Sequence, residues 1–286
     1  IGMLYIHAPN VHQGGGYSLL SSLIESVTTP VVFHMDRRFH SVPPLPEGSR
    51  VKFVKPTVCD RFRMERYLRN ITKADDKVLC FGNLPPLFQQ RARVFVYLQN
   101  IYLLDASCLG DLPLKVRMRL RLERFWLRRC LRNAELIVQT QTMADLVQVN
   151  LKRSAHVMPF YAPQERAARD SAPEYDFLFV ASGEAHKNHL RLFHAWEKLA
   201  ASGVMPKLAI TFEPDPNVEV GLALEQARKR GARINYVGSW KKPEMPRLYA
   251  KARFLIYPSL FESFGLPLLE AAQAGLPIIA AERDYV

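Results

Sequence analysis

Glu262 and Glu270 are two carboxylates separated by seven residues, on either side of a short loop. The positions of Pro267 and Gly275 are typical of the start and the end of a helix, so we predict a helix over 267–274. Glu262 then lies in the loop before this helix and Glu270 in its first turn. Both carboxylates could accept hydrogen bonds from the hydroxyl groups of a sugar or a ribose.

The start of this predicted helix offers unpaired backbone donors. The first N–H groups of a helix have no partner within the helix, and they attract anionic or hydroxyl oxygens. The donors here belong to Phe264, Gly265 and Leu266. Two glutamates alone need no ligand to explain them, because Glu262 could be solvated and Glu270 could merely complement the helix dipole. The loop as a whole favours a ligand site.

A second loop of this kind follows the first apolar run of the chain. Gly14, Gly15 and Gly16 open a predicted helix and leave backbone N–H groups available to a phosphate or a sugar. Leu19 stands where a dinucleotide fingerprint needs a third glycine, and no Gly-Lys-Ser/Thr follows, which disfavours a dehydrogenase and a P-loop NTPase. A flexible turn explains this loop equally well.

Gln99 and Asn100 end a strand-like segment, at the edge where open α/β sheets bind ligands. Asn100 could donate to a transferred sugar, although it cannot act as a base. The alternative is that Asn100 caps a turn.

The formal net charge of +12 is concentrated in one part of the chain. Residues 1–160 carry an excess of 11 positive charges and residues 161–286 an excess of one, so the first part is expected to face an anionic partner. The segment Lys115–Arg132 contains eight cations and one glutamate among apolar residues, a composition typical of helices on anionic membranes. The side chains predicted to face a membrane are Lys115, Arg117, Arg119, Arg121, Trp126 and Arg128. The alternative is a core-packed helix with a solvated basic face, and we expect no nucleic acid because no binding module for it is recognisable.

Strand-like and helix-like segments alternate along the chain. The strand-like segments are Met3–His7, Val31–His34, Val51–Val54, Lys77–Phe81, Val94–Leu98, Glu135–Gln139, Phe177–Ala181, Lys207–Phe212, Ile234–Gly238, Phe254–Pro258 and Pro277–Ala281. The helix-like segments are Tyr17–Val27, Phe62–Ile71, Leu114–Leu131, His189–Ala201, Gly221–Arg230, Met245–Lys251 and Pro267–Ala274. This alternation predicts an α/β fold with mainly parallel sheets. A stretch rich in Pro, Ala and charge predicts a Rossmann-like domain at 1–162, a linker at 163–173 and a second Rossmann-like domain at 174–286.

The segment PSLFESFGLPLLEAAQAGLP, which contains Glu262 and Glu270, resembles the signature of glycosyltransferase family 4. The similarity is dense over residues 175–277 and looser before them. Members of that family are retaining enzymes that use nucleotide sugars, and the resemblance implies the GT-B fold, in which two Rossmann-like domains face each other across a cleft. It also implies further elements after residue 286, so we expect the second domain to be incomplete in this chain.

The resemblance implies roles for the candidate residues of the second domain. Glu270 would bind the nucleotide ribose and Glu262 the donor sugar. The backbone at Phe264, Gly265 and Leu266 would hold sugar hydroxyls and the nearest phosphate.

The resemblance also implies how the diphosphate is bound. Lys187 matches a family lysine that neutralises the diphosphate leaving group, although a solvated cation at a helix start is the alternative. Ser182 stands where family members carry an arginine. Gly15 and Gly16, in the first domain, would lie near the donor phosphates.

The functional prediction is a retaining glycosyltransferase that moves a sugar from a nucleotide-diphosphate donor to a glycan or lipid-linked acceptor. Synthesis of lipopolysaccharide or another cell-surface polysaccharide is the implied setting. Because the chain contains no Asp-x-Asp, we expect no metal and no cofactor. A nucleotide-sugar epimerase of GT-B fold and a non-catalytic module associated with a membrane or RNA remain open.

Four cysteines without a C-x-x-C spacing suit a reducing compartment. The chain has no run of 18 apolar residues, and its first residues lack the features of a signal peptide. These features predict a cytoplasmic protein, and the basic segment predicts peripheral contact with the inner face of the plasma membrane.

Overall fold

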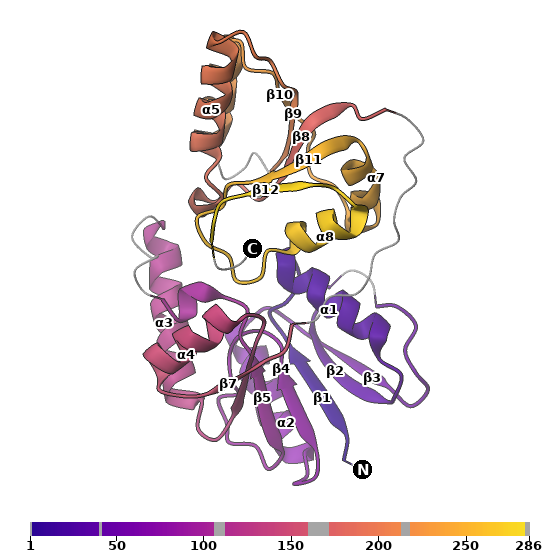
Figure 1. The fold of residues 1–286 in the computed structure, drawn as a ribbon. Coiled ribbons are helices and arrows are strands. Elements are labelled where there is room, and N and C mark those ends of the chain that lie inside the picture. Colours follow the sequence, from indigo (N-terminus) through magenta and orange to yellow (C-terminus); the bar gives the residue numbers. More distant parts are fainter. Residues whose placement is uncertain (1, 40–41, 106–111, 160–171, 213–217, 284–286) are drawn as a thin grey trace. The chain divides into compact units, whose positions relative to one another are not determined.

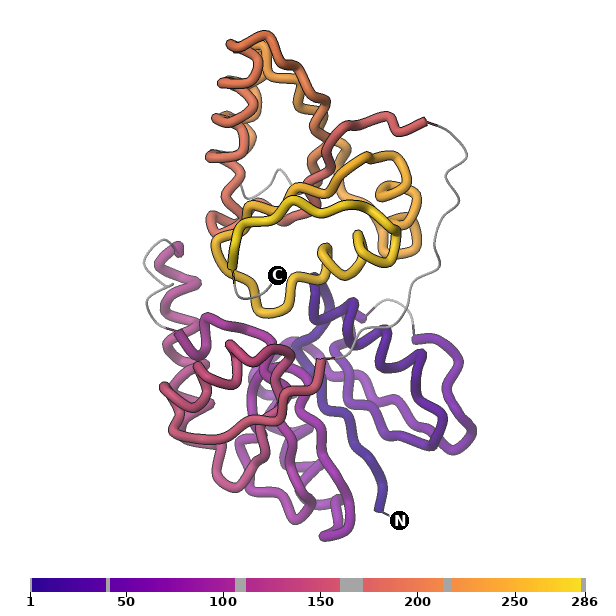
Figure 2. Tube along the Cα trace, in the orientation of Figure 1, coloured from indigo at the N-terminus to yellow at the C-terminus, as the bar shows by residue number. Residues whose placement is uncertain are grey.

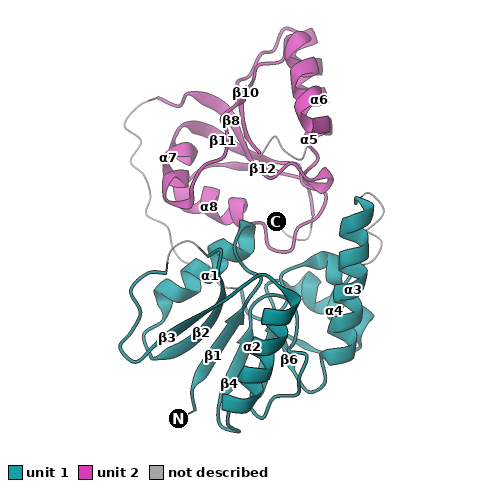
Figure 3. Ribbon diagram, turned by 180° about the vertical axis from the view of Figure 1, so that it is seen from behind, with its two compact units in different colours: residues 1–162 teal, residues 163–286 magenta. Residues whose placement is uncertain are grey.

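The computed structural model describes residues 2–39, 42–105, 112–159, 172–212 and 218–283 (Figures 1 and 2). The chain divides into two compact units, residues 1–162 and residues 163–286 (Figure 3). Each unit is built on its own parallel sheet. The predicted linker at 163–173 lies almost entirely outside the described residues.

The first unit contains a seven-stranded sheet in the order β3-β2-β1-β4-β5-β6-β7. Its strands are β1 (Leu4–Ala8), β2 (Val31–Asp36), β3 (Arg50–Val54), β4 (Lys77–Cys80), β5 (Arg93–Tyr97), β6 (Glu135–Val138) and β7 (Ala155–Val157). All neighbouring strands pair in parallel, with Leu4 opposite both Val31 and Lys77. A parallel sheet is covered on both faces, which explains the apolar strands.

The helices of the first unit are α1 (Gly14–Ser26), α2 (Val58–Ile71), α3 (Leu114–Cys130) and α4 (Gln141–Leu151), with a 3-10 turn η1 (Ile101–Leu103). Helices α1 and α2 cover opposite faces of the sheet (Figures 1 and 3). Because β1 lies in the middle of the sheet, the loop from β1 to α1 begins at the centre of its carboxyl edge.

The second unit contains a five-stranded parallel sheet in the order β10-β9-β8-β11-β12. Its strands are β8 (Tyr175–Val180), β9 (Leu208–Thr211), β10 (Ile234–Tyr236), β11 (Ala252–Tyr257) and β12 (Ile278–Ala280). Its helices are α5 (His189–Ala201), α6 (Val218–Lys229), α7 (Met245–Ala250) and α8 (Leu266–Ala274), with the 3-10 turns η3 (Ala185–Lys187) and η4 (Lys242–Glu244). Helix α5 packs beside α6, and α7 beside α8.

Helix α5 shows how this unit forms its core. His189, Leu192, Phe193 and Trp196 follow the spacing of one helix face and are all buried, and the last three belong to the apolar cluster of the second unit. Phe179, the fifth of the six residues of β8, is fully buried in the same cluster. Burial of this face positions the start of α5 at the end of β8.

Helix α8 is bounded by two glycines in the left-handed region, with φ of 72° at Gly265 and 71° at Gly275. Glycine adopts this conformation at low cost, so the two residues define the start and the end of the helix. The helix begins at Leu266, one residue before Pro267, and Glu270 is its fifth residue. The prediction that Glu270 lies in the first turn is therefore wrong, because one turn spans only 3.6 residues.

The predicted α/β class with two Rossmann-like units is confirmed, and every predicted strand and helix is present, α5 with the predicted ends and the others with shifted ends. Helix α4 and strand β7 were not predicted. The signal for α4 is a Thr140 hydroxyl that accepts from Met143 N at 3.3 Å, with buried Met143 and Val147 four residues apart. Strand β7 has only three residues at the edge of the sheet, which is too short for a periodic pattern.

Two glycine substitutions test the backbone of the second unit. Gly275→Ala places a Cβ on a residue with φ of 71°, so we expect the free energy of unfolding to fall by about 1–2 kcal/mol. Gly221→Ala lies in α6, where an added Cβ meets no atom within 4 Å, and we expect a gain of about 0.5–1 kcal/mol. Urea unfolding of both variants measures the difference, and equal effects would contradict the left-handed end of α8.

Candidate functional site

The second unit changes winding direction between β8 and β11. From β8 the chain moves outward through β9 to β10, and it returns to β11 on the other side of β8. Open α/β sheets bind ligands at the carboxyl ends of the two strands where the direction changes. The chain that leaves β8 contains Lys187, and the chain that leaves β11 contains Glu262.

Lys187, Glu262 and Tyr257 meet at this point, and we call these three side chains the Lys187 cluster. Lys187 Nζ lies 2.6 Å from Glu262 Oε1, and the Tyr257 hydroxyl donates to the same oxygen at 2.8 Å. The exposed fraction is 13% for Lys187 and 9% for Glu262, and Tyr257 is fully buried. Lys187 is thus a shielded, paired cation rather than a solvated one, and shielding from water strengthens its charged hydrogen bond.

Backbone and ring contacts hold the two loops of the cluster together. Leu260 N donates to His186 O at 2.8 Å, and Asn188 Nδ2 donates to Pro258 O at 3.1 Å. The His186 ring stacks on Phe261 with centroids 4.6 Å apart. These contacts fix both loops relative to the sheet, which pre-organises the cluster for a ligand.

The two histidines near Lys187 are neutral at pH 7. Burial lowers the pKa of His186, and burial together with the charge of Lys187 lowers the pKa of His189 to about 4. Lys187 is therefore the cation of loop 181–188. His189 packs among Phe179 and Phe212 with centroids 4.8 and 5.9 Å away, as a core residue.

Glu270 contacts a second buried tyrosine. The Tyr249 hydroxyl, on helix α7, donates to Glu270 Oε2 at 2.7 Å, and Tyr249 is 1% exposed. Each of the two predicted glutamates therefore accepts a hydrogen bond from a tyrosine on a neighbouring element. Sequence reasoning missed both tyrosines, because an aromatic residue at the end of a strand or within a helix is typical of a core position.

The remaining residues predicted to bind the sugar donor are those at the start of α8 and Ser182. Within the described residues no side chain caps α8, so backbone donors near Phe264, Gly265 and Leu266 face outward from the helix start. The Ser182 hydroxyl donates to Glu184 Oε2 at 2.6 Å within its own loop. Ser182 brings no positive charge to the position where the resembling family carries an arginine.

The first unit changes winding direction between β1 and β4. Gly15 and Gly16 lie in the first turn of α1, and a Cβ added at Gly16 would lie 3.5 Å from Gln99 Oε1. The glycine-rich start of α1 thus neighbours Gln99, the second residue after β5. Asn100 Oδ1 accepts from Tyr102 N at 3.0 Å, so Asn100 caps η1.

Helix α3 exposes apolar and cationic side chains together. Its inner face buries Leu120 and Leu127. Its outer face carries large apolar side chains that are between 59% and 70% exposed, namely Leu114, Met118, Leu122 and Phe125. The exposed cations around them are Lys115, Arg119, Arg121, Arg128 and Arg129, and Arg117 is half-buried. We call the apolar set with these exposed cations the α3 outer face.

Trp126 does not belong to the α3 outer face, contrary to the prediction from sequence. It is half-buried, its indole N–H donates to Pro85 O at 3.0 Å, and the Arg61 guanidinium lies 4.3 Å from its ring centroid. Helix geometry is the reason, since Trp126 follows Phe125 by about 100° around the axis and is turned away from the exposed stripe.

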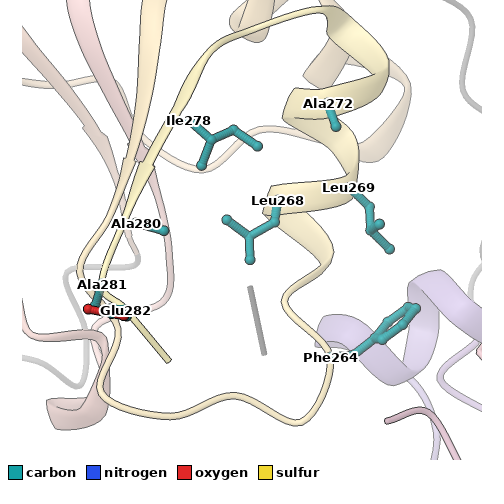
Figure 4. Close-up of a pocket in the computed structure, with 8 residues that line it drawn as sticks. All are labelled: Phe264, Leu268, Leu269, Ala272, Ile278, Ala280, Ala281 and Glu282. Atoms are coloured by element: carbon teal, nitrogen blue, oxygen red, sulfur yellow. The ribbon is translucent and has the colours of Figure 1, made fainter. Parts of the chain in front are cut away.

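A separate cavity of about 490 Å³ lies between α8 and β12 (Figure 4). It is lined by Phe264, Leu268, Leu269, Ala272, Ile278, Ala280, Ala281 and Glu282. Leu268 and Ile278 extend into it, and neither Glu262 nor Glu270 lines it. This cavity is mainly apolar and is distinct from the Lys187 cluster.

Three further features concern the described residues alone. No group of three His, Cys, Asp or Glu side chains there could hold a metal ion. Cys59, Cys80 and Cys130 are free thiols, and Cys108 lies outside the described residues. None of the described helices combines the length and apolar character needed to cross a membrane.

Residues 163–285 match the model of the family described as glycosyl transferases group 1. The chain is 44% identical to O-antigen chain mannosyltransferase B of Escherichia coli over 106 residues, which cover 36% of this chain and 28% of that protein. It is 34% identical to the serotype-specific mannosyltransferase WbdA of Escherichia coli over 126 residues, which cover 43% of this chain and 15% of that protein. The chain thus aligns with less than a third of the length of these curated relatives.

Solved structures resemble nearly the whole chain. WaaG, a glycosyltransferase involved in lipopolysaccharide biosynthesis, matches with a TM-score of 0.70 at 16% identity over 99% of this chain and 82% of that chain. Anabaena Alr3699/HepE in complex with UDP-glucose matches with a TM-score of 0.69 at 12% identity over 99% of this chain and 81% of that chain. At these identities the likeness establishes the fold. The chain therefore has the GT-B fold, and its residues 163–285 are similar to the glycosyl transferases group 1 family.

Proposed function

We propose that the protein is a glycosyltransferase that moves a sugar from a nucleotide-diphosphate donor to a glycan or lipid-linked acceptor in the synthesis of a cell-surface polysaccharide. The observation that carries this proposal is the Lys187 cluster, whose Glu262 lies four residues before the uncapped start of α8, within the residues that match the glycosyl transferases group 1 model. A sugar diphosphate needs a cation, backbone donors and hydroxyl acceptors, and this arrangement supplies all three. The names of the two mannosyltransferase relatives support mannose as the sugar and an O-antigen-like product.

Each part of the site has a role in this proposal. Glu270 binds the ribose and Glu262 the hydroxyls of the donor sugar, while Lys187 and the start of α8 hold the diphosphate. An ammonium has three donors, so Lys187 can contact Glu262 and a phosphate oxygen together. The positive charge of Lys187 and the dipole of α8 stabilise the departing diphosphate, so the proposal requires no metal ion.

The proposed transfer retains the configuration of the donor sugar. The bond between the anomeric carbon and the phosphate oxygen breaks, and the acceptor oxygen bonds to that carbon on the same face. The proton of the acceptor hydroxyl moves to the departing phosphate oxygen, so no enzymic base is needed. The resemblance of the Glu262–Glu270 segment to a retaining family supports this course, and NMR of the anomeric linkage in the product tests it.

Two isosteric substitutions test the roles of the glutamates. Glu270→Gln removes the ribose acceptor charge, so we expect the affinity for UDP or GDP in calorimetry to fall about tenfold. Glu262→Gln removes the contact with the transferred sugar, so we expect kcat to fall about 100-fold with nucleotide affinity changed by less than about threefold. Turnover is measured as the release of UDP from UDP-glucose or of GDP from GDP-mannose, with methyl α-mannoside as acceptor.

Glu225→Gln is the matched control, because Glu225 is an exposed glutamate on α6, 59% exposed. It should change neither nucleotide affinity nor turnover. Undiminished transfer in both Glu262→Gln and Glu270→Gln would rule out the proposed site. A thermal-shift panel of UDP-, GDP-, ADP- and CMP-sugars identifies the donor base through ligand stabilisation.

We further propose that the protein acts at the cytoplasmic face of the plasma membrane, where the α3 outer face contacts anionic lipid. Leu114, Met118 and Leu122 are spaced by four residues and Phe125 follows three later, which gives one exposed apolar stripe. Exposed apolar side chains flanked by cations favour a membrane interface, where the apolar groups enter the lipid and the cations meet anionic headgroups. The acidic residue of the helix, Glu123, is half-buried and lies 3.7 Å from Arg119, so it leaves the outer face positive.

Vesicle binding tests the α3 outer face. We expect Met118→Ser/Leu122→Ser and Arg121→Gln/Arg128→Gln each to weaken binding to phosphatidylglycerol vesicles by about tenfold or more, since each cation contributes about 1 kcal/mol. Higher salt should weaken wild-type binding, and phosphatidylcholine vesicles should bind poorly.

The matched control is Val58→Ser/Val149→Ser, which removes apolar side chains that are 85% and 62% exposed on α2 and α4. This variant should bind the vesicles like the wild type. Equal binding by the α3 variants and the control would refute a membrane role for α3.

A further inference from the structure

The two candidate glutamates share a feature that the proposed function does not use. Each accepts a hydrogen bond from a buried tyrosine hydroxyl, Tyr257 to Glu262 at 2.8 Å and Tyr249 to Glu270 at 2.7 Å. The two tyrosines belong to different elements, β11 and α7, and are 0% and 1% exposed. A buried hydroxyl needs a polar partner, and a carboxylate is a stronger partner than a neutral group.

The contact of Tyr257 is the more informative, because Glu262 Oε1 is shared between two donors. One donor is the mobile ammonium of Lys187, on a four-carbon stem, and the other is the hydroxyl of Tyr257, on a rigid ring in the sheet. A diphosphate competes with Glu262 for the ammonium, since both are anions. The neutral Tyr257 hydroxyl attracts a phosphate far less than the ammonium does, so it stays hydrogen-bonded to Glu262.

We infer that Tyr257 and Tyr249 are positioning residues with separate tasks. Tyr257 holds Glu262 toward the donor sugar while Lys187 shares its ammonium between Glu262 and the diphosphate, and Tyr249 holds Glu270 toward the ribose. This inference rests on the proposed function, because it assigns the two tasks through the roles of the two glutamates.

The second unit also contains a tyrosine and a glutamate that can serve as a control for the two tyrosine–glutamate contacts. Tyr175 is the first residue of β8, at the amino edge of the sheet, and its hydroxyl interacts with the Glu174 carboxylate. Burial and this carboxylate raise the pKa of Tyr175 to about 12. The pair therefore has the same chemistry at the edge opposite the Lys187 cluster.

The experiment compares Tyr257→Phe, Tyr249→Phe and Tyr175→Phe, which each lose one hydroxyl bonded to a glutamate. For Tyr257→Phe we expect kcat for GDP-mannose or UDP-glucose to fall about tenfold with the affinity for GDP or UDP unchanged, as for a lost hydrogen bond to a charged group. For Tyr249→Phe we expect the nucleotide affinity to fall about tenfold with kcat nearly unchanged. Tyr175→Phe should change neither. Melting temperatures of all three report any general loss of stability.

Double variants separate positioning from packing. A tyrosine that acts only through its glutamate has no further effect once that glutamate is altered. We therefore expect Tyr257→Phe/Glu262→Gln to match Glu262→Gln in kcat, and Tyr249→Phe/Glu270→Gln to match Glu270→Gln in nucleotide affinity. This comparison holds even where the single tyrosine variants are less stable.

The inference is overturned by additive effects in the double variants, by a loss of kcat and affinity that is the same in both tyrosine variants, or by an equal effect of Tyr175→Phe. An active wild type whose tyrosine variants are unchanged overturns the inference and leaves the proposed function standing. A wild type that binds neither nucleotide and transfers no sugar overturns both.

Discussion

The ion pair between Lys187 and Glu262 joins two loops at the carboxyl ends of neighbouring parallel strands, in a place where both side chains are largely shielded from water. Removing one partner of a buried pair leaves an uncompensated charge and costs about 3–5 kcal/mol. The pair persists because the backbone around it is held independently, through Asn188 to Pro258 and Leu260 to His186. The rest of the candidate site depends on this constraint, because the ion pair joins the loop before α5 to the loop before α8.

The constraint also explains the charge balance of the site. His186 and His189 are neutral because burial and the charge of Lys187 disfavour their protonated forms. In the proposed site, one cation and one carboxylate are therefore available to a ligand, together with the start of α8. A nucleotide diphosphate adds negative charge, which the N-terminal end of a helix accommodates without a change in protonation. The neutral hydroxyl of Tyr257 then keeps Glu262 in place while the cation is shared.

Part of the fold and of the candidate site could be predicted from the sequence, for physical reasons. The loop before α8 was predictable because Pro267 and Gly275 have strict backbone requirements, and the Gly14–Gly16 start of α1 for a similar reason. The contact between Lys187 and Glu262 spans 75 residues of sequence, and it depends on the order of strands, which no local pattern reveals. Tyr249 and Tyr257 resemble ordinary core aromatics in sequence, so only the structure reveals their hydroxyl contacts. Trp126 was misassigned because composition identifies an amphipathic segment but does not determine which side of the helix is buried.

A crystal structure of the protein with GDP-mannose or UDP-glucose bound tests the central claim most directly. We expect the diphosphate within hydrogen-bond distance of Lys187 Nζ and of the backbone N–H groups at the start of α8. The ribose should contact Glu270, and Tyr257 should remain bonded to Glu262. A nucleotide bound elsewhere, with the Lys187–Glu262 pair untouched and no phosphate at α8, would contradict the account.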